Sequence, residues 1–372
     1  MHVTTAIIGA ALAAAAAEGV KVNERLIALQ PNTWVRIHEQ KKDDAVRFMR
    51  QAHGGSCFDA KRGRLILFGS NTHGRDWKNS PYAFDPVTLT WSQFYPQDDP
   101  KTYAVNEQGI PVAGEKGDHP WATHTFGCVV YDTKRDEMVV CCAPQHMVPG
   151  RFTNAVKHLW GKIRKHPTWT LDLKTKQWRA LPCKPASFFP HSVSYDTDRH
   201  VIIGYSPGGV YELSGEPRTW KRVVKGGLFG WHDNSAYDAK HKALIVFGTN
   251  KNANDVVVYR VETREHRMMP TPGARPPKDQ HTPMAFDPGV GKTVIVIDHV
   301  LERDDKGRPK KTVAETWLYD LGADAWAQIK TATLPFGCGM NYNMEYDPNH
   351  KVHLLVTGGY RGATTVWALK VK

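Results

Sequence analysis

The sequence predicts an all-β protein in which six four-stranded antiparallel sheets form a ring. Three observations support this prediction. A strand–turn–strand unit recurs along the chain, and a second unit rich in tyrosine and tryptophan recurs between its copies. A lone strand near the N-terminus supplies the strand that the last copy lacks. Recurrence of one small unit is typical of folds that place similar supersecondary structures side by side.

The first repeated unit is a strand that ends in an aromatic–Asp pair or a close variant, then a turn and a second apolar strand. The aspartate can start the turn by accepting a hydrogen bond from the backbone two residues later. Its six copies are SCFDAKRGRLILFG (56–69), CVVYDTKRDEMVVCC (128–142), SVSYDTDRHVIIGY (192–205), NSAYDAKHKALIVFG (234–248), PMAFDPGVGKTVIVI (283–297) and NMEYDPNHKVHLLVTGG (343–359).

The second repeated unit is a strand with Tyr or Trp, an Asp-containing turn and a strand that carries Trp. Its copies are YAFDPVTLTW (82–91), WTLDLKTKQW (169–178), VYELSGEPRTW (210–220) and WLYDLGADAW (317–326), with VYRVETREHR (258–267) as a degenerate one. Two hairpins in succession make a four-stranded propeller blade. The units resemble kelch repeats, whose double glycine is present here only at Gly358–Gly359.

The sixth unit ends after its third strand, TTVWALKVK (364–372). The segment NTWVRIH (32–38) fits the missing strand, with Trp34 in the tryptophan position, so the N-terminal strand is expected to close a six-bladed β-propeller. A seventh blade would need a hairpin pair inside an insertion. We expect the three insertions to decorate one rim of the ring as functional loops; they are 97–120, 147–165 and 302–312.

Two segments define the domain organisation. Residues 1–20 are apolar and alanine-rich, which indicates either a signal peptide or a leading helix, and we expect the former. Residues 21–372 then form one propeller domain of a secreted or periplasmic protein. No later stretch is long and apolar enough to span a membrane. The six cysteines show no CxxC spacing, so most are expected to be buried apolar residues on strands.

Charge indicates the kind of partner. The net charge is +12 at pH 7, and a basic surface attracts polyanions such as nucleic acid or acidic polysaccharide. No run of five or more basic residues occurs, and the densest cluster is Arg308–Lys311. We therefore expect a monomer that binds an anionic polysaccharide or oligosaccharide, and neither nucleic acid nor a membrane.

Polar side chains gather where the inner hairpins begin and end. Since these ends meet at one mouth of the ring, the side chains should converge there. The hairpins begin at His53, His124 with Phe126, His191, His232, His281 and Asn341, and end at His73, His146, Tyr205, Asn250, His299 and Tyr360–Arg361. Three interpretations remain open: structural histidines, acid–base catalysis and a metal site.

This arrangement resembles the propeller-fold polysaccharide lyases, notably the ulvan lyases and related rhamnose–glucuronate lyases. His53 and His73 match two histidines of one blade in that group. The resemblance implies β-elimination from a uronate. It also implies a Tyr and an Arg in the following blade, where this chain has His124 and His146 instead.

β-Elimination requires a base for the C5 proton, a proton donor for the leaving oxygen and a group that neutralises the carboxylate. We assign His53 as base or acid, His73 and Arg361 to the carboxylate, and His124 or Tyr205 as the proton partner. Substrate-binding candidates at the same mouth are His146, Arg151, His191, Asn250, Asn341 and Tyr360.

A divalent metal such as Zn²⁺ or Mn²⁺ is the competing use of the histidines. Its candidate ligands are His232, His281 and His299, with Asn341 or Cys338 nearby. Two further functions stay open: a non-catalytic kelch-like module that binds a glycan or protein, and a metal-dependent propeller enzyme of another reaction type.

Overall fold

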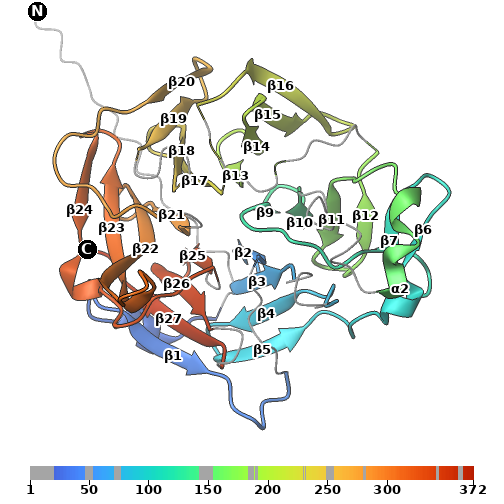
Figure 1. Cartoon of the computed structure of the whole chain (residues 1–372), viewed down its shortest axis with the longest axis horizontal. Coiled ribbons are helices and arrows are strands. Elements are labelled where there is room, and N and C mark those ends of the chain that lie inside the picture. The colour runs from blue at the N-terminus through green and yellow to red at the C-terminus, as the bar shows by residue number, and fades with distance from the viewer. Residues whose placement is uncertain are drawn as a thin grey trace, which may run out of the picture.

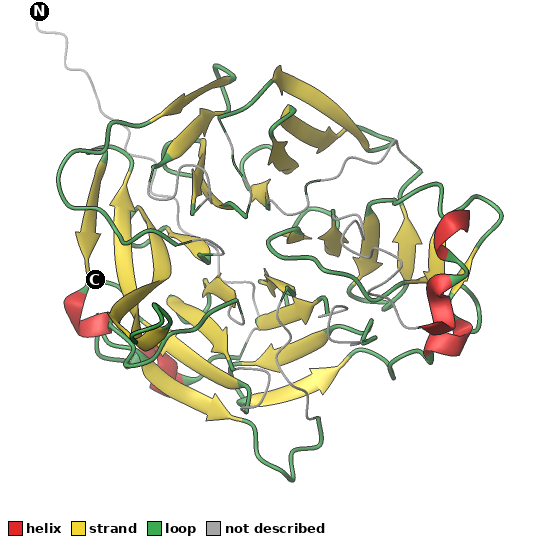
Figure 2. Cartoon of the chain, in the orientation of Figure 1, coloured by secondary structure: helices red, strands yellow, loops and turns green. Residues whose placement is uncertain are grey.

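The computed structural model describes residues 21–46, 53–70, 77–141, 154–182, 188, 192–228, 230, 232–248, 255–279, 282–340, 343–358 and 363–372. Within these residues the strands form six four-stranded antiparallel sheets and one three-stranded sheet. The four-stranded sheets stand like blades around a common centre (Figure 1), and helices are few and short (Figure 2). The all-β, propeller-like prediction is confirmed.

The first strand of each repeat lies nearest the centre. Each of these inner strands contacts the inner strands of the two neighbouring blades, so the contacts close into a ring. The inner strands are β2 (Gly55–Asp59), β9 (Val129–Asp132), β13 (Val193–Asp196), β17 (Asn234–Asp238), β21 (Met284–Asp287) and β25 (Asn343–Asp347).

Three further strands complete each blade toward the outside. The second strands are β3 (Arg64–Phe68), β10 (Glu137–Val140), β14 (Val201–Ser206), β18 (Ala243–Phe247), β22 (Lys292–Arg303) and β26 (Val352–Thr357). The third strands are β4 (Tyr82–Asp85), β11 (Trp169–Asp172), β15 (Gly209–Ser214), β19 (Val257–Arg260), β23 (Pro309–Asp320) and β27 (Thr365–Leu369). The outer strands are β5 (Thr90–Gln93), β12 (Trp178–Ala180), β16 (Thr219–Lys225), β20 (Glu265–Met268), β24 (Ala325–Gln328) and β1 (Val35–Glu39).

The two ends of the chain share one blade, as predicted. Strand β1 pairs antiparallel with β27, with Val35 opposite Ala368 and Glu39 opposite Thr365. Just outside the strands, the Asn32 backbone N–H donates to the Lys370 carbonyl oxygen at 2.7 Å. The sheet order β1-β27-β26-β25 therefore closes the ring without a separate terminal blade.

Tryptophan indoles at the outer-strand position connect blades 2, 3 and 6 to the preceding blade. The indole N–H of Trp34, just before β1, donates to Thr316 Oγ1 of β23 at 2.8 Å. Trp178 likewise donates to Tyr95 OH at 2.7 Å. Buried indoles contribute large apolar area and one directional bond, which explains why tryptophan recurs at this position of the repeat.

The repeat aspartates organise the inner turns. At Asp196, Oδ1 accepts the backbone N–H groups of Asp198 and Arg199 at 3.0 and 3.1 Å, and Arg199 Nε donates to Oδ2 at 2.6 Å. Four residues after each aspartate the backbone is left-handed, which is the conformation that closes this hairpin type. All six aspartates are at most 4% exposed: Asp59, Asp132, Asp196, Asp238, Asp287 and Asp347.

The insertions build no seventh blade in the described residues. The first one forms the three-stranded sheet, of β6 (Ala104–Val105), β7 (Pro111–Ala113) and β8 (His119–Pro120). Its core includes Trp121 and residues from the second insertion, around α2 (Asn154–Lys157). The third insertion lengthens the β22–β23 hairpin. The remaining helices are α1 (Glu24–Ile27) and 3₁₀ turns at Pro100–Thr102, Trp160–Lys162 and Lys330–Ala332.

Two other sequence predictions concern burial and membranes. Cys57, Cys128, Cys141 and Cys338 are buried, as expected, whereas Cys142 and Cys183 lie outside the described residues. Residues 1–20 also lie outside them. None of the helices in the described part of the chain has the length and apolar character needed to cross a membrane.

We expect Asp196→Ala to lower the free energy of unfolding by about 2–4 kcal/mol, because it removes a buried carboxylate that accepts three hydrogen bonds from the inner turn. Urea unfolding monitored by tryptophan fluorescence measures the change. Asp305→Ala is the matched control, because Asp305 is exposed in the β22–β23 hairpin loop, and it should change stability by less than about 0.5 kcal/mol. Equal effects of the two variants would contradict the role given to the repeat aspartates.

Candidate functional site

A central channel runs between the inner strands. Its volume is about 490 Å³, and inner strands of all six blades line it. Small polar groups such as Ser56, Ser194 and Ser235 alternate with apolar ones such as Met284 and Met344 along its wall. A mostly apolar cavity with a few convergent polar groups is the usual form of a ligand site.

His53 and His232 precede inner strands at one end of the channel, next to the lining residues Gly54 and Phe126, and both have a left-handed backbone. His53, Phe126 and His232 each stand six residues before a repeat aspartate. Their φ angles are 72°, 42° and 64°, in the left-handed region that residues with a Cβ seldom adopt. Strain of this kind persists where the surrounding structure fixes it, and it concentrates at functional sites.

His53 and His124 come together from adjacent blades. Their rings stack with centroids 4.4 Å apart and an interplanar angle of 28°. Phe126 contacts His53 at a centroid distance of 4.9 Å and His232 at 5.9 Å. His124 is only 2% exposed, whereas His53 and His232 keep partial exposure. His53 is therefore the imidazole of the pair that can reach a ligand, and His124 packs behind it.

Backbone hydrogen bonds explain why the two rings meet. The segment 123–126 leads into blade 2 but lies across the end of blade 1. Thr123 O accepts the Ser70 backbone N–H at 2.9 Å, and His53 O accepts the backbone N–H groups of Thr125 and Phe126 at 2.9 and 3.0 Å. His124 is held between these anchors, beside His53.

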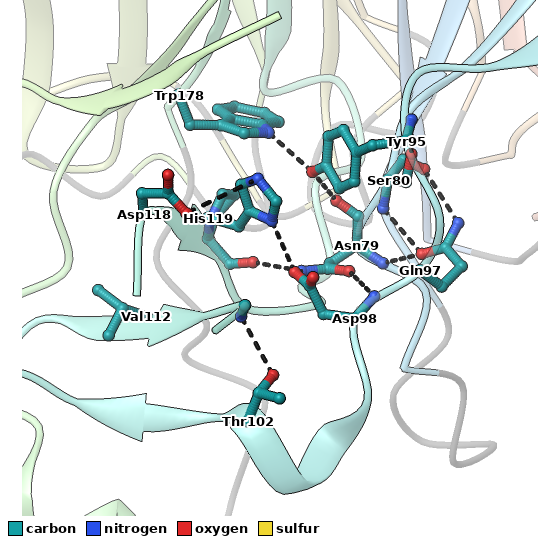
Figure 3. A network of polar contacts seen from close by, with 12 residues as sticks. Asn79, Ser80, Tyr95, Gln97, Asp98, Thr102, Val112, Asp118, His119 and Trp178 are labelled. Atoms are coloured by element: carbon teal, nitrogen blue, oxygen red, sulfur yellow. Dashed lines mark hydrogen bonds and ion pairs between the residues drawn. The ribbon is translucent and has the colours of Figure 1, made fainter. Parts of the chain in front are cut away.

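The first insertion supports this segment through a polar network (Figure 3). His119 Nδ1 lies 2.8 Å from Asp98 Oδ2, and Asp98 Oδ2 also accepts from Asn79 Nδ2 at 2.7 Å. The Tyr95 ring stacks on His119 with centroids 4.3 Å apart. Next along the chain, the Trp121 indole donates to Val112 O at 2.7 Å. The backbone leading into His124 is thus fixed at residues 119–121.

Two predicted site residues lie elsewhere. Tyr205 is fully buried in the apolar cluster between blades 3 and 4, and its hydroxyl lies 3.2 Å from Ser192 Oγ. Burial raises the pKa of Tyr205 well above its usual value. A phenol in this position cannot contact a polysaccharide, so Tyr205 cannot be the proton partner predicted from the sequence. At the end of β14 the Tyr205 side chain packs between blades 3 and 4. The repeat pattern does not show to which side of the strand this side chain points.

His299 belongs to a different polar group, on the lengthened β22–β23 hairpin. Its Nδ1 lies 2.8 Å from Glu315 Oε1, and Glu315 Oε2 accepts the Trp317 indole N–H at 2.9 Å. His232 instead packs near Phe126. In the described portion of the chain, no three His, Cys, Asp or Glu side chains form a group that could hold a metal ion.

Many predicted site residues lie outside the described residues, and their roles stay predictions. They are His73 and Arg361 among the catalytic candidates, His281 among the metal candidates, and His146, Arg151, His191, Asn250, Asn341 and Tyr360 among the substrate-binding candidates.

Glu345 is a candidate that the sequence reasoning missed. It lines the channel from β25, and Ser56 Oγ of β2 donates to its Oε1 at 2.6 Å. Loss of hydration inside the channel raises the pKa of Glu345 to about 7, although the Ser56 hydrogen bond opposes the shift. The available signal was a lone Glu in the inner strand NMEYD, where the other inner strands carry small or apolar residues.

The raised pKa predicts how stability depends on pH. The folded protein holds the Glu345 proton up to about pH 7, whereas the unfolded chain loses it near pH 4.5, so this group lowers stability as pH rises through that window. We expect the stability of Glu345→Gln relative to the wild type to increase by up to about 3 kcal/mol between pH 5 and pH 8. Urea unfolding at both pH values measures it.

Glu107→Gln serves as the control for this prediction, because Glu107 is exposed. Its stability relative to the wild type should not change between the two pH values. A Glu345→Gln difference that is constant with pH would contradict the assignment of a protonated carboxyl in the channel.

Known proteins do not identify this site: no protein-family model matches the chain, and no curated protein matches it.

Proposed function

We propose that this protein is a secreted or periplasmic polysaccharide lyase, with a six-bladed kelch-like propeller, that cleaves a uronic-acid-containing glycan by β-elimination. One observation carries the proposal. His53 is a partly exposed imidazole at the mouth of the channel, held in a left-handed backbone conformation and stacked on the buried His124. An imidazole with a fixed orientation suits proton transfer near neutral pH.

His53 acts as the base in this proposal. It takes the C5 proton of the uronate, the C5–H electron pair forms the C4–C5 double bond, and the C4–O4 bond breaks. The leaving O4 then receives a proton, which the protonated His53 can return when C5–H and O4 lie on the same face of the sugar. His124 is too buried to touch the sugar, so its role is to orient the His53 ring.

Charge supports an anionic substrate. The net charge of +12 favours the approach of a polyanion. The carboxylate must be neutralised because negative charge develops on it in the transition state. We assign this task to His73 and Arg361, which follow the second strands of blades 1 and 6. No step of the proposal requires a metal ion.

We expect His53→Ala to lower the rate of elimination by about 100-fold or more, because general acid–base groups contribute at least that much. The assay incubates the protein with a panel of acidic glycans and follows the absorbance of the unsaturated uronate near about 230 nm. His200→Asn is the matched control: His200 is exposed in an inner turn, and Asn tolerates its left-handed φ of 56°. The control should keep full activity.

Two outcomes would overturn the proposal. Full activity of His53→Ala would remove the proposed base. Binding of acidic glycans by the wild type with no rise in absorbance on any of them would favour the second candidate, a kelch-like binding module.

A further inference from the structure

We infer that the central channel contains a binding site for a small cation, between β2 and β25. This site is separate from His53 and His124 at the mouth of the channel, and it goes beyond the proposed lyase activity. Glu345 is the only acidic or basic side chain among the described residues that line the channel. Its neighbours on β2 are Ser56, which donates to it, and Cys57, whose pKa burial raises well above the usual value, so that the thiol is neutral.

A carboxylate without a cationic partner is costly in a low-dielectric channel. Among the described residues no basic side chain pairs with Glu345, whose hydrogen-bond partner is the Ser56 hydroxyl, so below about pH 7 the protein avoids this cost by keeping the carboxyl protonated. A bound cation would supply the missing positive charge. The inner strand on the other side of β25 is β21, which lines the channel with Met284 and Ala285, and neither residue carries a charge.

Asn343 provides a second, independent indication. Its Nδ2 donates to the Gly54 carbonyl oxygen at 3.2 Å, while its buried Oδ1 accepts no hydrogen bond. A buried amide oxygen without a protein donor is an acceptor that a water or a cation can contact. Asn343 and Glu345 are two residues apart on β25, so both side chains lie on the same face of the strand.

The chemistry of the oxygens defines the ligand class. Glu345 offers a carboxylate, Asn343 an amide oxygen and Ser56 the lone pairs of a hydroxyl, all without a competing basic group. Such oxygens bind hard metal ions such as Ca²⁺, and an alkylammonium group offers three N–H donors to the same set. The ligand is therefore a small cation, and its source is either a metal ion or an amine.

The experiment measures the thermal midpoint of the full-length protein at pH 8. Calcium chloride and methylammonium chloride are the two probes. Tetramethylammonium chloride at matched ionic strength is the control, because it is a cation without N–H donors. A ligand that binds only the folded state raises the midpoint. We expect one of the two probes to raise it above the control, and which one does so identifies the source of the cation.

Titration calorimetry with that probe then tests the residues and the pH dependence. With the pKa of Glu345 at about 7, the ionised fraction rises about tenfold between pH 6 and pH 8, so affinity should rise by a similar factor. Glu345→Gln should abolish binding and Asn343→Ala should weaken it, whereas His53→Ala should bind as the wild type does. The inference is overturned if neither probe exceeds the control, or if Glu345→Gln binds as tightly as the wild type.

Discussion

The pairing of β1 with β27 is the constraint on which the rest of the structure depends. The last blade has three strands from the C-terminal end of the chain and one from the N-terminal end, so the ring exists only when the two ends meet. Trp34 extends this closure to the preceding blade through its bond to Thr316. In the closed ring each inner strand contacts two neighbours, and these strands together line the channel.

The rim site is a consequence of the same closure. Segment 123–126 crosses from blade 2 onto blade 1 and bonds to the backbone at Ser70 and His53, which brings His124 against His53. The left-handed backbone at His53 and His232 is maintained because a rigid scaffold surrounds it. The insertion sheet adds a second layer of support by fixing the backbone at residues 119–121.

Short-range patterns in the sequence predicted most of the fold. The aspartate turns, the recurring tryptophans and the stray strand at 32–38 are short-range signals, and the structure contains each of them. The topology also predicted that His53 and His124 share one mouth of the channel.

The environments of Tyr205 and Glu345 were not predicted, because they depend on residues of neighbouring blades. A tyrosine at a strand end can face the channel or the blade interface, and only packing decides. A lone Glu in an apolar strand gives no sign that it lies inside a channel with one hydroxyl partner.

Together these features describe a positively charged ring with two separate polar sites: an imidazole pair at the mouth and a carboxylate in the channel. The central functional claim is that an anionic glycan binds at the imidazole pair. Histidine-selective ¹⁵N NMR during titration with acidic oligosaccharides tests it most directly. The account predicts that the ring signals of His53 and His124 shift on binding, while those of His200, in a distant turn, and of the buried His350 stay unchanged. Shifts that spare His53 and His124 would contradict it.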